Sequence, residues 1–343
     1  MAGIDYVMTA RNVSQGGFGD EPGPVKFLRV PSNMDVPTPA HAVKKVEIKR
    51  WFAEVQGFAD GDENPNSISP RGDVLIFVHG YNNSLDIIMK RQRRLSADLR
   101  AEGWRGLVIG FDWPSGSETL NYYEDREDAA SVAVYLVSDV IKPLSENQAN
   151  GCETNVHVIG HSTGAYVIME ACAQAEKIGE IFQSTWRIGQ AAFIGGDIGS
   201  DSLAADDDWS KPMFKRIMRL TNYSNPNDAV LAVSNAKRLG TAPRAGRVGL
   251  PVNAHSKATN VNCGAYFAEL DPDNSPHFGT FNHSWHIGDR VFARDLAMTL
   301  EGAIDRNAIP TRRIEHGGLA LQDRPRPKYM AKWDIPHPRK PES

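Results

Sequence analysis

Short apolar runs recur along this chain, and from residue 74 onward they alternate with stretches whose apolar residues have helical spacing. The runs predict strands at residues 5–9, 25–30, 46–55, 74–78, 107–111, 155–159, 191–194 and 217–222. The spacing predicts helices at residues 84–102, 123–142 and 163–177. Strands that alternate with helices are typical of a parallel sheet covered by helices. The sequence therefore predicts an α/β protein with a mostly parallel central sheet and helices on both faces.

The two ends of the chain differ from this pattern. The runs before residue 74 have no helical stretch between them, only loops at 15–24 and 57–72, so we expect antiparallel strands that join the same sheet. Past Gly302, basic residues are interleaved with prolines, a composition that favours neither a strand nor a long helix. We expect one domain over residues 1–302 and a basic, proline-rich tail over 303–343. Tyr329, Trp333 and Ile335 would either pin this tail to the body or to a second subunit of a homo-oligomer, or lie in a solvated tail.

Composition excludes several classes of function. No apolar stretch approaches the roughly 18 residues that a membrane helix needs. A net charge of −4 gives no electrostatic reason to expect a nucleic-acid partner. The first residues lack the basic and apolar regions of a secretion signal, and Cys152, Cys172 and Cys263 have no metal-binding spacing and suit a reducing compartment. We therefore expect a cytoplasmic protein without a membrane span.

The segment Gly160-His-Ser-Thr-Gly164 follows a predicted strand and precedes a predicted helix. A serine at the apex of such a turn forms a nucleophile elbow, and the helix start points its amides at whatever the serine attacks. This context predicts that Ser162 is a catalytic nucleophile.

A serine nucleophile needs a histidine that takes its proton and a carboxylate that orients the histidine. In chain order the acid comes next, and Asp228, in the turn-rich cluster after the strand at 217–222, is the preferred candidate. Asp197, which follows the strand at 191–194, is its competitor.

The base must come from a loop late in the chain, where His277, His283, His286 and His316 are available. His283 and His286 both lie just before a helical stretch at 290–301, and spacing alone does not separate them. They are three residues apart with no third ligand nearby, which makes a weak metal site, so we expect no metal and no cofactor.

An ester carbonyl under attack also needs backbone N–H donors for its developing negative charge. The Thr163 amide, at the start of the helix after the nucleophile, is one expected donor. The other is the Tyr81 amide in the loop Val78-His-Gly-Tyr-Asn-Asn83, where Gly80 permits close approach of the backbone and His79 packs or hydrogen-bonds locally.

These motifs together resemble the DUF900 group of α/β-hydrolase-fold proteins. The resemblance covers about residues 6–302 and rests on Phe77-Val-His-Gly-Tyr-Asn-Asn-Ser84, Phe111-Asp-Trp-Pro-Ser115, Tyr123-Glu-Asp-Arg-Glu127, the elbow, Asn227-Asp228 and His283-Ser-Trp285, in this order. It implies a Ser162, Asp228 and His283 triad, because the His-Ser-aromatic segment of the family falls on His283. The chain departs from the family at Thr163, where methionine is usual, and in a longer segment over 240–281.

The sequence also names candidates for the substrate pocket. They are Asn82, Trp113, His161 and Trp285, with core packing of Trp113 as an equal alternative. Residues 197–213 lie where this fold often inserts a cap, but they are too few for a lid domain.

We therefore expect a serine hydrolase that cleaves small carboxylic esters through an acyl-enzyme. A thioesterase, amidase or lipase would use the same triad, and a non-catalytic binding protein would keep the same fold.

Overall fold

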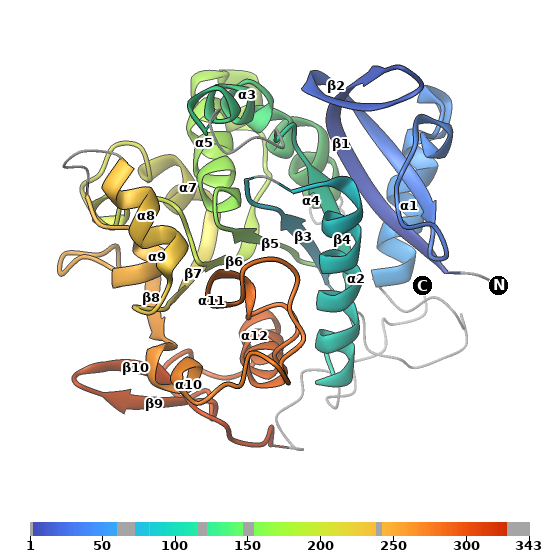
Figure 1. Ribbon diagram of the computed structural model, residues 1–343. Helices are drawn as coiled ribbons and strands as arrows, with labels where there is room; N and C mark the ends of the chain where they lie inside the picture. Colours follow the sequence, from blue (N-terminus) through green and yellow to red (C-terminus); the bar gives the residue numbers. More distant parts are fainter. Residues whose placement is uncertain are drawn as a thin grey trace, which may run out of the picture.

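A computed structural model describes residues 3–59, 73–81, 83–115, 122–146, 154–237 and 242–327 (Figure 1). Their strands form one ten-stranded sheet in the order β2-β1-β4-β3-β5-β6-β7-β8-β10-β9. Every neighbouring pair from β1 to β10 is parallel, and the two edge pairs, β1 with β2 and β10 with β9, are antiparallel. The strands are β1 Ile4–Ser14, β2 Gly17–Pro31, β3 Val74–Val78, β4 Leu107–Asp112, β5 Val156–His161, β6 Ile188–Ile194, β7 Ile217–Ser224, β8 Ala258–Asn262, β9 Arg312–Glu315 and β10 Gly318–Leu321.

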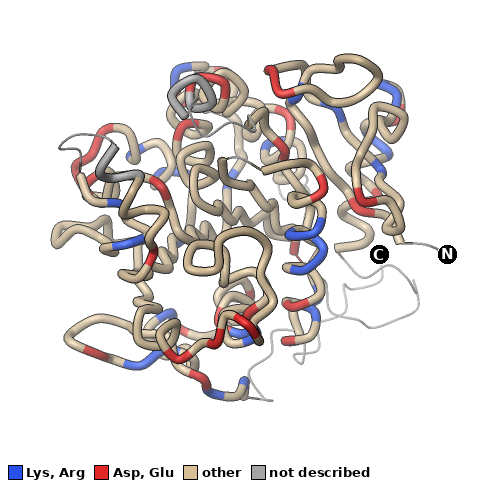
Figure 2. Tube along the Cα trace, viewed as in Figure 1, with Lys and Arg blue, Asp and Glu red and all other residues tan. Residues whose placement is uncertain are grey.

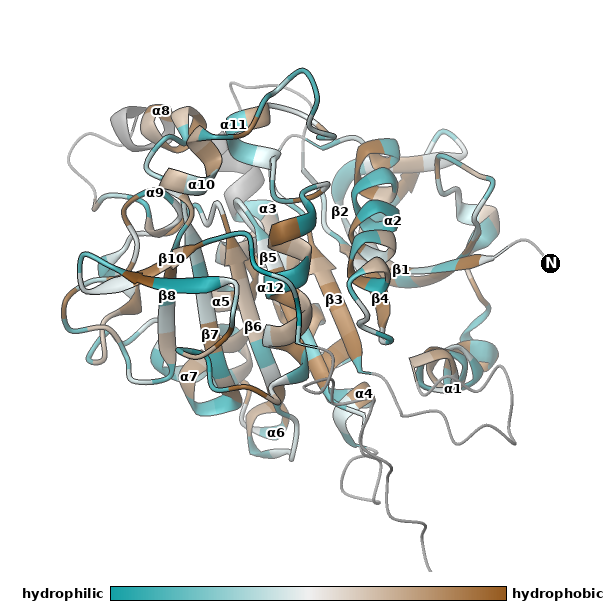
Figure 3. Ribbon diagram, turned by 90° about the horizontal axis from the view of Figure 1, so that it is seen from below, coloured by the Kyte–Doolittle hydropathy of each residue, from teal (hydrophilic) through white to brown (hydrophobic). Residues whose placement is uncertain are grey.

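Helices cover both faces of this sheet (Figures 1 and 3). They are α1 Ile48–Ala59, α2 Leu85–Ala101, α3 Tyr122–Tyr135, the π-helical turn η3 Leu136–Ile141, α4 Lys142–Glu146, α5 Gly164–Lys177, α6 Gly179–Gln183, α7 Lys211–Arg216, α8 Ala229–Lys237, α9 Ala245–Val248, α10 Gly264–Ala268, α11 Phe281–Ser284 and α12 Arg290–Glu301, with 3-10 turns η1 Pro39–His41, η2 Lys45–Glu47 and η5 Asp201–Leu203. The predicted fold class, an α/β protein with a mostly parallel sheet, is confirmed.

The central strand β3 shows why an uninterrupted apolar run belongs inside such a sheet. All five of its side chains are fully buried. Val74, Ile76 and Val78 pack in the core cluster that includes α1, α3 and α5, whereas Leu75 and Phe77 pack in the cluster that includes α2 and α12. Each such side chain contributes roughly 1.5–3 kcal/mol of burial free energy. This core fixes the ends of β3, β4 and β5, from which the candidate site is built.

The strand predicted at 46–55 is wrong, because these residues lie mainly in helix α1. Its buried residues are Trp51, Val55 and Ala59, four positions apart, which is helical spacing. Val46 is 88 % exposed and was not part of any core face. The predicted loop at 15–24 is also wrong beyond Gly16, since β2 begins at Gly17. The antiparallel pairing of β1 with β2 is confirmed, although β1 joins the sheet parallel to β4.

The prediction that no strand follows Gly302 is wrong as well. Residues 312–321 form the hairpin β9–β10, and β10 pairs with β8, so the sheet continues past the expected domain end. No proline falls between residues 311 and 324, and His316 and Gly317 both take positive φ at the turn. Tyr329, Trp333 and Ile335 lie outside the described residues. Among the helices that the structure describes, none is long and apolar enough to span a bilayer.

The sequence also singled out a cap segment at 197–213 and a long segment at 240–281, and the described residues of both contain helices or strands. Residues 197–213 contain η5 and the start of α7, and residues 242–281 contain α9, β8 and α10. Isolated bridges from Gly199 to Arg244 and from Ala204 to Ala254 join the two segments. A cap role for 197–213 stays a prediction.

Candidate active site

Ser162 lies at a sharp turn between β5 and α5. Its φ of +54° is in the left-handed region that residues other than glycine seldom adopt, and such strain is typical of functional sites. The turn is held by hydrogen bonds from Ser162 N to the Ile194 carbonyl and from Asp197 N to the Ser162 carbonyl, each 3.0 Å. A Cβ on Gly160 would lie 2.7 Å from Ala165 N, and one on Gly164 would overlap the Val78 carbonyl. The two glycines are therefore needed for the tight turn at the serine.

Asp228 follows β7 and contacts a histidine. One carboxylate oxygen, Oδ1, accepts from Leu231 N at 2.9 Å and thereby caps α8, while Oδ2 lies 2.6 Å from His283 Nδ1. Asp228 is fully buried and His283 is 7 % exposed. Because a carboxylate can only accept, Nδ1 donates, and Nε2 of a neutral His283 keeps its lone pair. This is the tautomer that a general base requires.

The competing residues have other partners. Asp197 forms an ion pair with Arg244 at 3.0 Å, and both side chains are 4 % exposed. His286 is buried against the Trp285 ring at 4.2 Å, and burial lowers the pKa of His286 to about 3. His277 donates through Nδ1 to the Ser275 carbonyl, and His316 lies at the β9–β10 turn. Of the predicted alternatives, the structure brings only Asp228 and His283 together.

Two neighbours place the His283 ring beside the elbow. Gly195 directly follows Ile194, the last residue of β6, whose carbonyl accepts from Ser162 N. A Cβ on Gly195 would lie 3.1 Å from His283 Cε1. The His161 ring, one residue before the serine, has its centroid 4.9 Å from that of His283, and its Nε2 donates to the His283 carbonyl at 3.2 Å. His283 and its partner Asp228 therefore lie close to the residue that precedes Ser162, and a triad that includes Ser162 stays a prediction.

The loop after β3 approaches the nucleophile closely. A Cβ on Gly80 would lie 2.7 Å from Ser162 Cβ, so any other residue would push the loop away. The Gly80 carbonyl accepts from His79 Nδ1 at 2.8 Å and from Asn83 Nδ2 at 2.7 Å, and Asn83 Nδ2 also reaches the Tyr81 carbonyl at 3.0 Å. The Tyr81 and Thr163 amides belong to the two segments beside Ser162. Their role as oxyanion donors stays a prediction.

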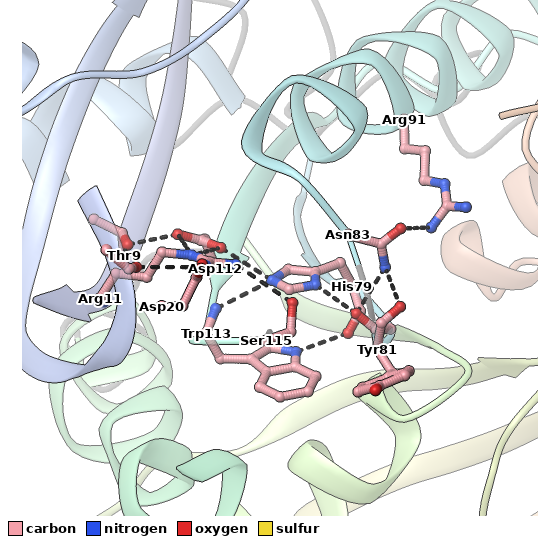
Figure 4. A network of polar contacts seen from close by, with 12 residues as sticks. Thr9, Arg11, Asp20, His79, Tyr81, Asn83, Arg91, Asp112, Trp113 and Ser115 are labelled. Atoms are coloured by element: carbon pink, nitrogen blue, oxygen red, sulfur yellow. Dashed lines mark hydrogen bonds and ion pairs between the residues drawn. The ribbon is translucent and has the colours of Figure 1, made fainter. Parts of the chain in front are cut away.

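His79 fixes this loop from behind, as Figure 4 shows. Its ring is fully buried, and burial lowers its pKa. Nδ1 donates to the Gly80 carbonyl at 2.8 Å, and Nε2 lies 3.1 Å from both Trp113 N and Asp112 Oδ1. Trp113 stacks on His79 with ring centroids 5.2 Å apart and donates through Nε1 to the His79 carbonyl at 2.8 Å. The local hydrogen bonding expected for His79 is confirmed.

A buried polar network that sequence reasoning missed lies next to His79. Asp112, at the end of β4, accepts from Arg11 Nε at 2.9 Å and from Thr9 Oγ1 at 2.5 Å. Burial alone would raise the pKa of Asp112, but the Arg11 guanidinium holds it below its usual value. The available signal was the pair of charged residues at the ends of two predicted strands, which become neighbours only when β1 pairs with β4.

The predicted pocket residues are mostly buried. Trp113, His161 and Trp285 are 0 %, 2 % and 1 % exposed, and Trp285 packs against the rings of Tyr266 and Phe267. Their observed contacts support the loops around Ser162, and a part in binding substrate stays a prediction. Asn82 lies outside the described residues. Within the described part of the chain, no three His, Cys, Asp or Glu side chains are grouped to hold a metal.

Solved structures with a similar chain course share little sequence with this protein. An esterase of Pyrobaculum calidifontis is 13 % identical over 67 % of this chain and 76 % of its own, with a TM-score of 0.33. A lipase-esterase related protein of Clostridium acetobutylicum is 12 % identical over 70 % and 96 %, with a TM-score of 0.34. A Trichoderma reesei cutinase is 11 % identical over 74 % and 89 %, with a TM-score of 0.29. At these TM-scores the likenesses carry no argument about activity.

A comparison with curated proteins gives no significant match. A family model described as "Alpha/beta hydrolase of unknown function (DUF900)" matches residues 64–273, which is more than half of the chain and includes the elbow, the loop after β3 and Asp228. The chain therefore belongs to the DUF900 family of α/β hydrolases, whose function is unknown.

Proposed function

We propose that this protein is a serine hydrolase that cleaves small carboxylic esters through an acyl-enzyme, with Ser162 as nucleophile, His283 as general base and acid, and Asp228 as the orienting acid. The observation that carries the proposal is the 2.6 Å contact from His283 Nδ1 to Asp228 Oδ2, beside a serine held at a φ of +54°. A buried carboxylate, a histidine of defined tautomer and a strained serine are the parts that acyl transfer needs.

The reaction proceeds in two balanced halves. Ser162 Oγ attacks the ester carbonyl carbon while His283 Nε2 takes the hydroxyl proton, and the Tyr81 and Thr163 amides donate to the oxyanion. Collapse of the tetrahedral intermediate breaks the bond to the alcohol oxygen, which takes the proton from His283. Water then attacks the acyl-enzyme by the same route, and the acid product leaves with Ser162 restored.

The experiment compares wild type with Ser162→Ala on short p-nitrophenyl esters. We expect kcat to fall by roughly 10⁴ to 10⁶, because the variant loses the nucleophile. The matched control is Ser131→Ala on α3, whose hydroxyl donates to the Asp128 carbonyl of the same helix, and it should keep wild-type activity. A Ser162→Ala enzyme with more than about a tenth of the wild-type rate would disprove the assignment.

A fluorophosphonate probe separates catalysis from mere retention of the fold. Wild type should be labelled on Ser162, whereas Ser162→Ala should not. A folded wild-type protein that neither labels nor turns over any ester would favour a binding role. Ester, thioester and amide substrates with the same acyl group then define the leaving group, which the triad by itself does not select.

A further inference from the structure

Helix α2 carries several basic residues, seen as the blue stretch of α2 in Figure 2, and one of them differs from its neighbours. Lys90, Arg93 and Arg94 are partly exposed and form ion pairs with Asp86, Asp5 and Asp98. Arg91 is only 4 % exposed, and its hydrogen bonds within the described residues go to neutral groups. Burial lowers the pKa of Arg91 to about 10, so it is still a cation at neutral pH.

A buried cation without a carboxylate partner is unfavourable. The free-energy cost of taking such an ion from water is several kcal/mol, and an apolar side chain of similar size would avoid it. The contacts that Arg91 makes compensate for this cost. Its planar guanidinium group can join separate segments of the chain, because the N–H donors point in several fixed directions at once.

The first segment that Arg91 holds is the loop after β3. Arg91 NH1 donates to Asn83 Oδ1 at 2.7 Å, which orients the Asn83 amide so that Nδ2 donates to the Gly80 and Tyr81 carbonyls (Figure 4). Through Asn83, the cation therefore fixes the peptide group that contains the Tyr81 amide, the proposed oxyanion donor, and the peptide group after it.

The second segment is the loop that carries His283. Arg91 Nε donates to the Phe278 carbonyl at 3.2 Å, and NH2 donates to Ser284 Oγ at 3.1 Å, so the guanidinium contacts this loop on both sides of the histidine. Gly279 has a φ of +103°, and a Cβ there would lie 2.8 Å from Arg91 NH2, so the loop conformation and the close approach both favour glycine.

The third contact is to the elbow. Arg91 NH1 lies 3.5 Å from His161 Nδ1, while His161 Nε2 donates to the His283 carbonyl at 3.2 Å. His161 therefore has its proton on Nε2 and its lone pair toward Arg91. Burial and then the Arg91 charge lower the pKa of His161 well below its usual value.

We propose that Arg91 is a positioning residue that holds the loop after β3, the residue before the nucleophile and the histidine loop in one arrangement, an inference that rests on the proposed function. Its donors are occupied by the protein, so it acts through these loops and not by touching substrate.

The test uses Arg91→Met and Arg91→Lys. The matched control is Arg93→Met, two residues further along the same helix. Misplacing catalytic groups by about 1 Å lowers rates by about 10²-fold, so Arg91→Met should lose about 10²-fold in kcat with KM changed by less than about threefold. Arg91→Lys keeps the charge but has a single donor centre that cannot span the loops, so it should lose at least about tenfold. Arg93→Met should stay within about threefold of wild type in kcat, because Arg93 pairs with Asp5 on β1, away from Ser162.

Hydrogen exchange provides a readout that does not depend on turnover. Peptides covering residues 79–84 and 278–286 should exchange faster in both Arg91 variants, while peptides of β3 to β7 keep wild-type protection. The histidine NMR titration of His161 should move to higher pH in Arg91→Met, since the nearby cation is gone.

Three outcomes decide the matter. Wild-type exchange in both loops of Arg91→Lys would overturn the proposal, whatever its activity. If Arg91→Met unfolds as a whole, Arg91→Lys carries the test, and local loosening without loss of global protection supports the proposal. If wild type has no esterase activity and no probe labelling, the proposed function fails, and the exchange data still decide whether Arg91 joins the loops.

Discussion

Two buried arginines in this protein have opposite electrostatic settings. Arg312 lies 2.6 Å from the fully buried carboxylate of Asp295 and also contacts Tyr223 and Thr299, whereas the partners of Arg91 are neutral. Burial lowers the pKa of Arg312, but the Asp295 charge outweighs it and raises that pKa above the usual value. The pKa of Arg91 falls to about 10 because no such charge opposes burial.

The difference separates two uses of a buried polar group. The Arg312 pair joins the hairpin β9–β10 to α12 and cancels its own charge, so its effect is on the folding free energy. Arg91 leaves a positive charge next to the elbow, where the proposed reaction develops negative charge. We therefore expect changes around Arg312 to affect stability, and changes around the site to affect turnover.

The largest expected effect is on the site side of this comparison. In Asp228→Asn, the amide can donate to His283 Nδ1, which would leave the proton on Nε2 and remove the base, so kcat should fall by about 10⁴-fold with little loss of stability. Asp197→Asn, which leaves Arg244 without its carboxylate, should destabilise the fold but keep most turnover per folded molecule. Kinetics on samples checked by circular dichroism distinguish the two. A reversed order would assign the acid to Asp197.

On the structural side, Arg312→Met should lower the free energy of unfolding by about 3–5 kcal/mol, because it leaves Asp295 buried and unpaired. Urea unfolding measures the loss, and kcat of the folded fraction should stay near wild type. Adding Asp295→Asn to this variant should recover part of the stability, since the uncompensated charge is removed. A large kcat loss in folded Arg312→Met would mean that the two regions are coupled.

The smallest effect is a change in the pH dependence of stability. The pKa of His286 is about 3 in the folded protein, below the unfolded value of about 6.5, so the unfolded chain binds more protons as the pH falls through this window. This residue alone should remove about 2 kcal/mol of stability between pH 6.5 and pH 5. His286→Phe should remove this loss from the free energies of unfolding measured in urea at pH 6.5 and pH 5. An unchanged slope of stability against pH would show that His286 has the same pKa in the folded and unfolded chain.

The central sheet and the candidate site residues were predictable from the amino-acid sequence. Five consecutive apolar residues at β3 and the glycines around Ser162 are local signals, because strand length and turn sterics act over a few residues. The local pattern predicts the wrong structure in two places. At α1 the buried residues have helical spacing, and at β9–β10 prolines flank a short strand pair that the composition of the segment does not indicate.

Tertiary packing determines which candidate residues come into contact. Asp228 and Asp197 both follow strands, and His283 and His286 share a loop. In the folded protein Asp228 contacts His283, whereas Asp197 pairs with Arg244. Arg91 lies in a basic stretch of α2 with no motif of its own, and its contacts reach residues up to 193 positions away in the chain. The sequence ranked Asp228 first and its family resemblance favoured His283, but desolvation and hydrogen-bond direction depend on neighbours that come together only on folding, which is the physical reason that local patterns did not reveal Arg91 or the contacts of these residues.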